Sequence, residues 1–166
     1  MKNKTTSSAP EILVTTGYFV PFTRLFQAMD HYAGVTGKQV LVQGNRGDYS
    51  FRHAEHVTAL TNLHELMKQA EVVITHGAMT LVEILELGVP LVAVPRRLVY
   101  KEHIDDHQVC FAKWLAEKYN FPVVMEIDDL FPSIEKAEKT VPPKYESEAK
   151  VLNDFLAATL EAWALE

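Results

Sequence analysis

The sequence predicts a single α/β domain of the Rossmann type, in which a doubly wound parallel sheet is covered by helices on both faces. Segments typical of strands alternate with segments typical of helices along most of the chain, as in repeated strand–helix–strand units. Several strand segments are apolar throughout, which is typical of strands buried on both faces. The length of 166 residues corresponds to one domain.

The expected strands are short runs of apolar and β-branched residues bounded by turn residues. The first (EILVTT) ends at Gly17, and the second (KQVLVQ) ends at Gly44. The third is weaker because fewer of its residues are apolar. The strands are expected at residues 11–16, 38–43, 53–60, 71–75, 90–94 and 122–125.

The expected helices carry apolar residues three and four positions apart. The first begins at Pro21 and is stopped by Gly34 and Gly37. Asn62 caps the second helix, and Gly88 ends the third. The second, third and fourth helices are expected at residues 62–70, 80–87 and 104–119.

The chain divides into a flexible N-terminus (residues 1–10), the Rossmann-like domain (residues 11–140) and a C-terminal helix (residues 141–166). Pro142 and Pro143 mark a hinge before this helix. Its apolar residues form one broad stripe, made of Val151, Leu152, Phe155, Leu156, Leu160 and Trp163. The stripe suits either docking on a partner chain or packing on the chain's own sheet.

Composition and charge exclude several classes of protein. Apolar residues make up 48% of the chain and charged residues 23%, as in an ordinary globular domain. The net charge of −6 leaves no extended basic face, so no nucleic-acid partner is expected. No apolar run reaches the ~20 residues of a membrane-spanning helix. The one cysteine, Cys110, cannot form an internal disulfide and fits a reducing compartment, so we expect a cytoplasmic domain.

Three loops at the carboxyl ends of the expected strands are candidates for a ligand site, because ligands bind at that edge of an open α/β sheet. In the first loop, a strand runs through His76 and Gly77 into a helix (VVITHGAMTLVE). The free amides at that helix start would bind a diphosphate. Thr80 would add a hydroxyl, and Glu83, on the same helix face, would accept hydrogen bonds from a ribose. Alternatively, Thr80 and Glu83 form a capping box, which would use the carboxylate on the backbone.

The second loop leads from Arg96 to Gln108 and is crowded with polar side chains. His103 and His107 are four residues apart with two aspartates between them, a spacing that allows metal chelation. Aspartates at a helix start are also ordinary capping residues. The mixed donors and acceptors suit the hydroxyls of a sugar as well, and we favour that interpretation over a metal site.

Two smaller features lie near these loops. In the third loop, Gly17 either lets the backbone approach a ligand or forms a plain strand–helix turn. A small basic cluster, formed by Arg96, Arg97 and Lys101, would suit a single phosphate or an anionic membrane surface.

Three motifs in order carry a resemblance to a known family. They are HGAMTLVE (residues 76–83), LGVPLVAVPR (residues 87–96) and EHIDDHQ (residues 102–108). Together they resemble the C-terminal, donor-binding domain of family-28 glycosyltransferases of the GT-B fold. The resemblance covers about residues 11–125 and is greatest to the small catalytic subunit of two-chain enzymes. These enzymes act in exopolysaccharide and capsule synthesis, or as the UDP-N-acetylglucosamine transferase of the dolichol pathway.

The resemblance implies a UDP-sugar donor and inverting transfer to a lipid-linked acceptor, with no cofactor and no metal in the chemistry. The turn would bind the diphosphate, and Glu83 would bind the ribose. His107 and Gln108 would bind the hydroxyls of the donor sugar, and the backbone near Leu60 would bind the uracil. One departure is Ala78-Met79, which stands where the family has a glycine-rich pair. The donor-binding residues implied are Gly17, Leu60, His76, Gly77, Ala78, Thr80, Glu83, Arg96, His107 and Gln108.

The resemblance also implies a missing half, because a GT-B enzyme has two Rossmann-like domains and this sequence predicts one. We therefore expect a membrane-anchored, Rossmann-like partner subunit that supplies the acceptor site and the general base. Within this chain, only His103 is a candidate base, and a loop or capping role is the simpler interpretation. The chain would be inactive alone and located in the cytoplasm, at the membrane face through its partner. The alternatives are a non-catalytic interaction module or a free-standing nucleotide-sugar hydrolase or epimerase.

Overall fold

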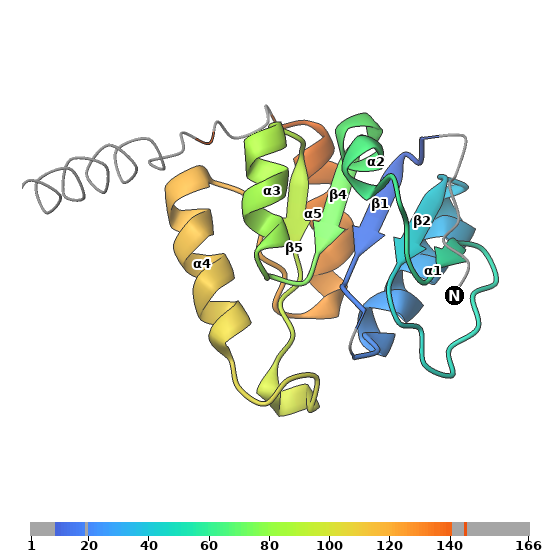
Figure 1. Cartoon of the computed structure of the whole chain (residues 1–166), viewed down its shortest axis with the longest axis horizontal. Helices are drawn as coiled ribbons and strands as arrows, with labels where there is room; N and C mark the ends of the chain where they lie inside the picture. Colours follow the sequence, from blue (N-terminus) through green and yellow to red (C-terminus); the bar gives the residue numbers. More distant parts are fainter. Residues whose placement is uncertain (1–8, 19, 141–144, 146–166) are drawn as a thin grey trace, which may run out of the picture.

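The computed structural model describes residues 9–18, 20–140 and 145, and it confirms the α/β class (Figure 1). Five strands form one sheet in the order β3-β2-β1-β4-β5, and every neighbouring pair is parallel. The strands are β1 (Ile12–Thr15), β2 (Val40–Gln43), β3 (Glu55–Val57), β4 (Val72–Thr75) and β5 (Leu91–Ala93).

Helices cover both faces of this sheet, as the apolar strands predict. Along the central strand β1, Ile12 and Val14 face one apolar core and Leu13 faces another, because successive side chains of a strand point to opposite sides. One face is covered by α1 (Thr23–Thr36) and α5 (Leu130–Glu138). The other is covered by α2 (Leu63–Gln69), α3 (Thr80–Leu87) and α4 (His107–Tyr119). Figure 1 shows these two layers of helices on either side of the strands.

The first helix is longer than its glycines predict. Gly34 lies inside α1, and a Cβ built there would approach the His53 ring to 2.8 Å. The glycine therefore allows a close packing contact instead of ending the helix. Gly37, with φ +71°, does end it, and its N–H donates to the carbonyl of Ala33.

Several predicted elements differ from the structure near the edges of the sheet. The third strand is limited to β3, and residues 122–125 contribute only a single parallel bridge, between Val123 and Ala93. The fourth helix begins at His107 instead of residue 104, after the 3₁₀ turn η1 (Leu98–Tyr100). Helix α5 and the preceding 3₁₀ turn η2 (Ile127–Asp129) were not predicted from the sequence.

The predictions for both ends of the chain lie largely outside the described residues. The flexible N-terminus falls on residues 1–8, and the hinge and the C-terminal helix fall on 141–144 and 146–166. Tyr145 is the one residue described in that last part of the sequence. Its ring lies 5.6 Å from that of Tyr119, at the end of α4.

Candidate functional site

The order of the strands marks one place where a ligand site is expected. Strands β1 and β4 are neighbours, but β1 leads into α1 on one face of the sheet and β4 leads into α3 on the other. Ligands of such sheets bind at the carboxyl ends of strands where the connections diverge in this way. The two loops meet there, because a Cβ built on Gly17 would lie 3.6 Å from Cε1 of His76.

The β4–α3 turn presents free backbone donors at this position. Gly77 has φ +86°, and α3 begins at Thr80 after Met79. Within the described part of the chain, the N–H groups of Gly77, Ala78, Met79 and Thr80 have no hydrogen-bond acceptor. Four adjacent donors at the positive end of a helix form a site suited to an anion.

The capping-box alternative is wrong. Thr80 is the first helical residue and not the cap, and no side-chain hydrogen bond caps this helix. Glu83 lies within the first turn of α3 and its side chain is exposed to solvent. The carboxylate is therefore available to a ligand that is bound at the turn.

The third motif lies directly against this turn. A Cβ built on Gly77 would approach the carbonyl oxygen of Gln108 to 3.2 Å and Cβ of Pro95 to 3.4 Å. Gln108 is 5% exposed, and its side-chain oxygen accepts the N–H of Arg96 at 3.2 Å. That oxygen therefore accepts a hydrogen bond inside the protein, and this bond joins the start of α4 to Arg96. The contact between Gln108 and a sugar hydroxyl that the resemblance implies stays a prediction.

Arg96 differs from its expected role at a phosphate. Its side chain is buried, and its guanidinium donates to the carbonyl oxygens of Val20 (2.6 Å), Pro21 (2.9 Å) and Thr16 (3.3 Å). It also lies over the ring of Phe22, at 4.5 Å. Burial lowers its pKa to about 10, so the group stays charged at neutral pH. Arg96 holds the β1–α1 loop in place.

His76 lies between these loops as a neutral group. Burial lowers its pKa to about 4, and the positive charge of Arg96 acts in the same direction. The carbonyl of Thr15 acts in the opposite direction. Its Nδ1 is buried and has no hydrogen-bond partner in the described part of the chain. At neutral pH the imidazole can therefore form a hydrogen bond with a ligand but carries no charge.

The lowered pKa of His76 predicts a loss of stability in acid. Between its usual pKa of 6.5 and about 4, the unfolded chain binds a proton at this residue that the folded chain does not. We therefore expect this residue to lower the free energy of unfolding by up to about 3 kcal/mol as the pH falls through that window. Urea unfolding at pH 7.5 and 4.5 measures the loss, which should be smaller in His76→Gln.

Two comparisons make this measurement specific. His56 also has a pKa lowered by burial, so part of the acid loss should remain in His76→Gln. The same substitution at His64, which is exposed on α2, controls for the loss of any imidazole. An equal acid loss in wild type and His76→Gln would contradict the assignment.

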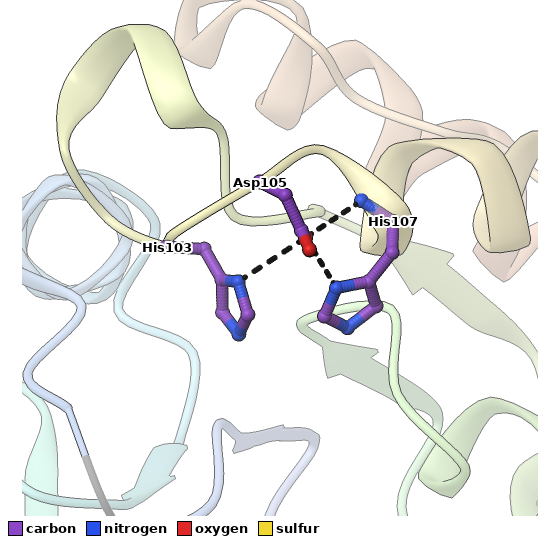
Figure 2. Close-up of side chains that lie close together, drawn as sticks. All are labelled: His103, Asp105 and His107. Atoms are coloured by element: carbon purple, nitrogen blue, oxygen red, sulfur yellow. Dashed lines mark hydrogen bonds and ion pairs between the residues drawn. The ribbon is translucent and has the colours of Figure 1, made fainter.

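His107 and His103 lie on either side of the Asp105 carboxylate, in the segment that leads into α4 (Figure 2). Oδ1 of Asp105 accepts the backbone N–H of His107 at 3.1 Å and contacts Nδ1 of the same residue. It also lies 3.5 Å from Nδ1 of His103. These contacts with His107 hold the pKa of Asp105 below its usual value. The His107 side chain is 60% exposed and is free to contact a ligand.

An ion pair that was not predicted from the sequence fixes this loop. Arg24 of α1 contacts both carboxylate oxygens of Glu102, at 2.8 and 3.0 Å. Glu102 also accepts the N–H of Arg97 at 3.1 Å. The pair joins residues 78 positions apart, and no local pattern in the sequence indicates it.

Two features remain, the position of Leu60 and a cavity. Leu60, whose backbone was expected near the uracil, lies between β3 and α2 and packs against the core on the α2–α3 face. A cavity of about 460 Å³ lies between α1 and the η2–α5 segment, with His31 and Phe131 in its wall. None of the predicted donor-binding residues lines this cavity.

Among the described residues, no helix is both long enough and apolar enough to cross a bilayer.

Comparisons with known proteins agree with this fold. Three solved structures are similar. The glycotransferase of kitacinnamycin is 15% identical with a TM-score of 0.56, and the match covers 84% of this chain and 38% of that chain. The spinosyn forosaminyltransferase SpnP is 14% identical with a TM-score of 0.54, and the match covers 82% of this chain and 36% of that chain. MurG of Acinetobacter baumannii is 16% identical with a TM-score of 0.55, and the match covers 83% of this chain and 48% of that chain. At these identities the likeness shows the fold. The chain spans 36% to 48% of the length of these three proteins.

Among curated proteins, none matches the sequence. The family model of the glycosyltransferase family 28 C-terminal domain, however, matches residues 22–160, which include the turn, the buried arginine and the His103–His107 segment. The chain therefore belongs to the glycosyltransferase family 28 C-terminal domain family, and its Rossmann-like sheet has the fold of the C-terminal half of a GT-B enzyme.

Proposed function

We propose that this chain is the donor-binding subunit of an inverting glycosyltransferase and takes a UDP-sugar as its donor. The observation that carries the proposal is the group of four free amides at the β4–α3 turn, with the exposed Glu83 in the first turn of α3. A diphosphate on the amides would leave a ribose within reach of this carboxylate. Family membership supports the same assignment.

The proposed chemistry follows from where charge develops. When the bond between the sugar and the diphosphate breaks, negative charge grows on the departing phosphate. Amides fixed in advance around that phosphate stabilise this charge. The neutral His76 adds a hydrogen bond beside them, and the exposed His107 is placed to contact sugar hydroxyls. The proposed reaction relies on these groups and not on a cofactor or a metal.

The acceptor side of the reaction belongs to a second, membrane-anchored Rossmann-like subunit in this proposal. That subunit supplies the general base and binds a lipid-linked acceptor in polysaccharide or glycolipid synthesis, which would hold this chain at the cytoplasmic face of the membrane. The support is that the similar solved proteins are more than twice as long as the domain that they share with this chain. Addition of the partner should convert a chain that binds the donor but transfers no sugar into an active enzyme.

Substitution of Glu83 tests the donor site. Glu83→Ala should weaken UDP binding about 10- to 100-fold, because hydrogen bonds to a charged group contribute roughly 1.5–3 kcal/mol. Isothermal titration calorimetry with UDP measures the change. Glu86→Ala is the matched control, since Glu86 is also exposed on α3 but lies three residues further from the turn.

The outcomes separate the proposal from its alternatives. No heat with UDP or any UDP-sugar would indicate an interaction module that has kept the fold without the donor site. Hydrolysis of a UDP-sugar by the purified chain alone would indicate a free-standing hydrolase. Equal affinity in Glu83→Ala and Glu86→Ala would remove Glu83 from the site.

A further inference from the structure

The segment before α4 brings three potential metal ligands together. His103, Asp105 and His107 each offer one ligand atom, and these atoms all lie within 4.8 Å of one another. Figure 2 shows both imidazoles on the same side of the chain, with the carboxylate between them. The two rings are nearly perpendicular, with centroids 4.6 Å apart, so they do not stack on one another.

One nitrogen of this cluster lacks a satisfied partner. Nδ1 of His103 is buried and makes no hydrogen bond within the described part of the chain, although it faces Oδ1 of Asp105 at 3.5 Å. The same oxygen already contacts His107 through both its backbone and its ring. A buried nitrogen left unpaired costs free energy, and a cation between the three groups would remove that cost.

The backbone that carries the cluster is held on both sides. Glu102, which precedes His103, is fixed by its two contacts with Arg24. Asp106, which precedes His107, accepts the N–H of Leu98 at 2.8 Å. A set of ligands that is held in place before binding loses less conformational entropy when the ion arrives.

We infer that His103, Asp105 and His107 form a binding site for a divalent transition-metal ion such as Zn²⁺ or Co²⁺. Two imidazole nitrogens and one carboxylate suit these ions, whereas Mg²⁺ and Ca²⁺ prefer oxygen ligands alone. Three protein ligands leave a fourth tetrahedral position open. Binding replaces the contact between Asp105 and His107 and fixes the loop before α4.

This site uses none of the diphosphate-binding amides, and it shares one residue, His107, with the donor site of the proposed function. It lies close to them, because Gln108 follows His107 and packs against the β4–α3 turn. The ion therefore stabilises the loop that borders the donor, and the chemistry at the amides does not depend on it. Metal binding is accordingly measured on the full chain without nucleotide.

The test is a titration with Co²⁺, followed by visible absorption, and with Zn²⁺, followed by calorimetry. Wild type should bind one ion per chain, and His103→Ala and His107→Ala should each weaken binding at least tenfold. Mg²⁺ in excess should not compete. Zn²⁺ should also raise the melting temperature of wild type, and a chelator should reverse the increase.

Two control variants make the assignment specific. His64→Ala removes an imidazole that is also exposed beside a carboxylate, that of Glu65, and should bind the ion like wild type. Cys110→Ser removes an exposed thiol one turn after His107 on α4 and should also bind normally. Binding that is absent in wild type, or lost equally in either control, would overturn the inference. A failure of UDP to bind would leave the metal result unchanged, so the two proposals fail separately.

Discussion

Asp30→Ala should destabilise the fold by about 3–5 kcal/mol, as expected when a buried charged hydrogen-bond partner is removed. The Asp30 side chain lies on α1 and is only 3% exposed. Its carboxylate accepts the backbone N–H groups of Arg52, His53 and Ala54 at 2.8 to 3.1 Å. The hydroxyl of Tyr49 also donates to it, at 3.0 Å. The truncation would leave these donors without their acceptor and release the loop between β2 and β3.

The pKa of Asp30 indicates how strongly these donors act. Burial alone would raise it, but the three backbone N–H groups and the hydroxyl of Tyr49 together hold it below 3.8. The charged form of Asp30 thus stabilises the fold at neutral pH. This contribution is lost only as the pH falls below 3.8 and through the lowered pKa that Asp30 has in the folded protein. That window lies below the one assigned to His76, so the two effects can be measured separately.

Urea unfolding at pH 7 measures the loss in Asp30→Ala. Asp30→Asn keeps one carbonyl oxygen without the charge, so its loss should be intermediate. Asp48→Ala is the matched control, because Asp48 is exposed in the same loop. A loss in Asp30→Ala no larger than that of the control would show that the loop is held by other contacts.

Asp30 also shows what the sequence could not reveal. The spacing of apolar residues predicted the helix that carries it and the strands on either side of the loop, because burial repeats along the chain with a regular period. The partners of Asp30 lie 19 to 24 positions away, and three of them are backbone groups, which carry no mark in the sequence. A buried aspartate cannot be distinguished by pattern from an exposed one.

The candidate site was predictable to the extent that its chemistry is local. The donors of the β4–α3 turn come from consecutive residues, so a strand, a small-residue turn and a helix were enough to indicate them. The role of Arg96 was not local, because the carbonyls that it contacts precede it by 75 to 80 positions. The sequence showed a cation near the site but not whether the guanidinium would contact a ligand or the backbone of another loop.

Gly77→Ala should reduce UDP affinity about 100-fold, because Gly77 gives the β4–α3 turn its shape with a positive φ. A side chain at φ +86° is strained by about 1–2 kcal/mol. The new Cβ would also lie 3.2 Å from the carbonyl oxygen of Gln108, so the turn and α4 would have to separate by a few tenths of an ångström. Displacing two amides from a diphosphate removes two charge-assisted hydrogen bonds, each worth roughly 1.5–3 kcal/mol.

Gly88→Ala separates backbone strain from displacement of the turn. Gly88 ends the same helix with φ +65°, and a Cβ built there meets no atom within 4 Å. The free energy of unfolding of this variant should fall by a similar amount, about 1–2 kcal/mol, which is the cost of placing alanine in the left-handed backbone conformation. The variant should nevertheless bind UDP like wild type. Calorimetry with UDP and urea unfolding of both variants measure the two effects. If Gly77→Ala folds and binds UDP as tightly as Gly88→Ala, the diphosphate does not lie on these amides, because the one change that must move them would have had no consequence.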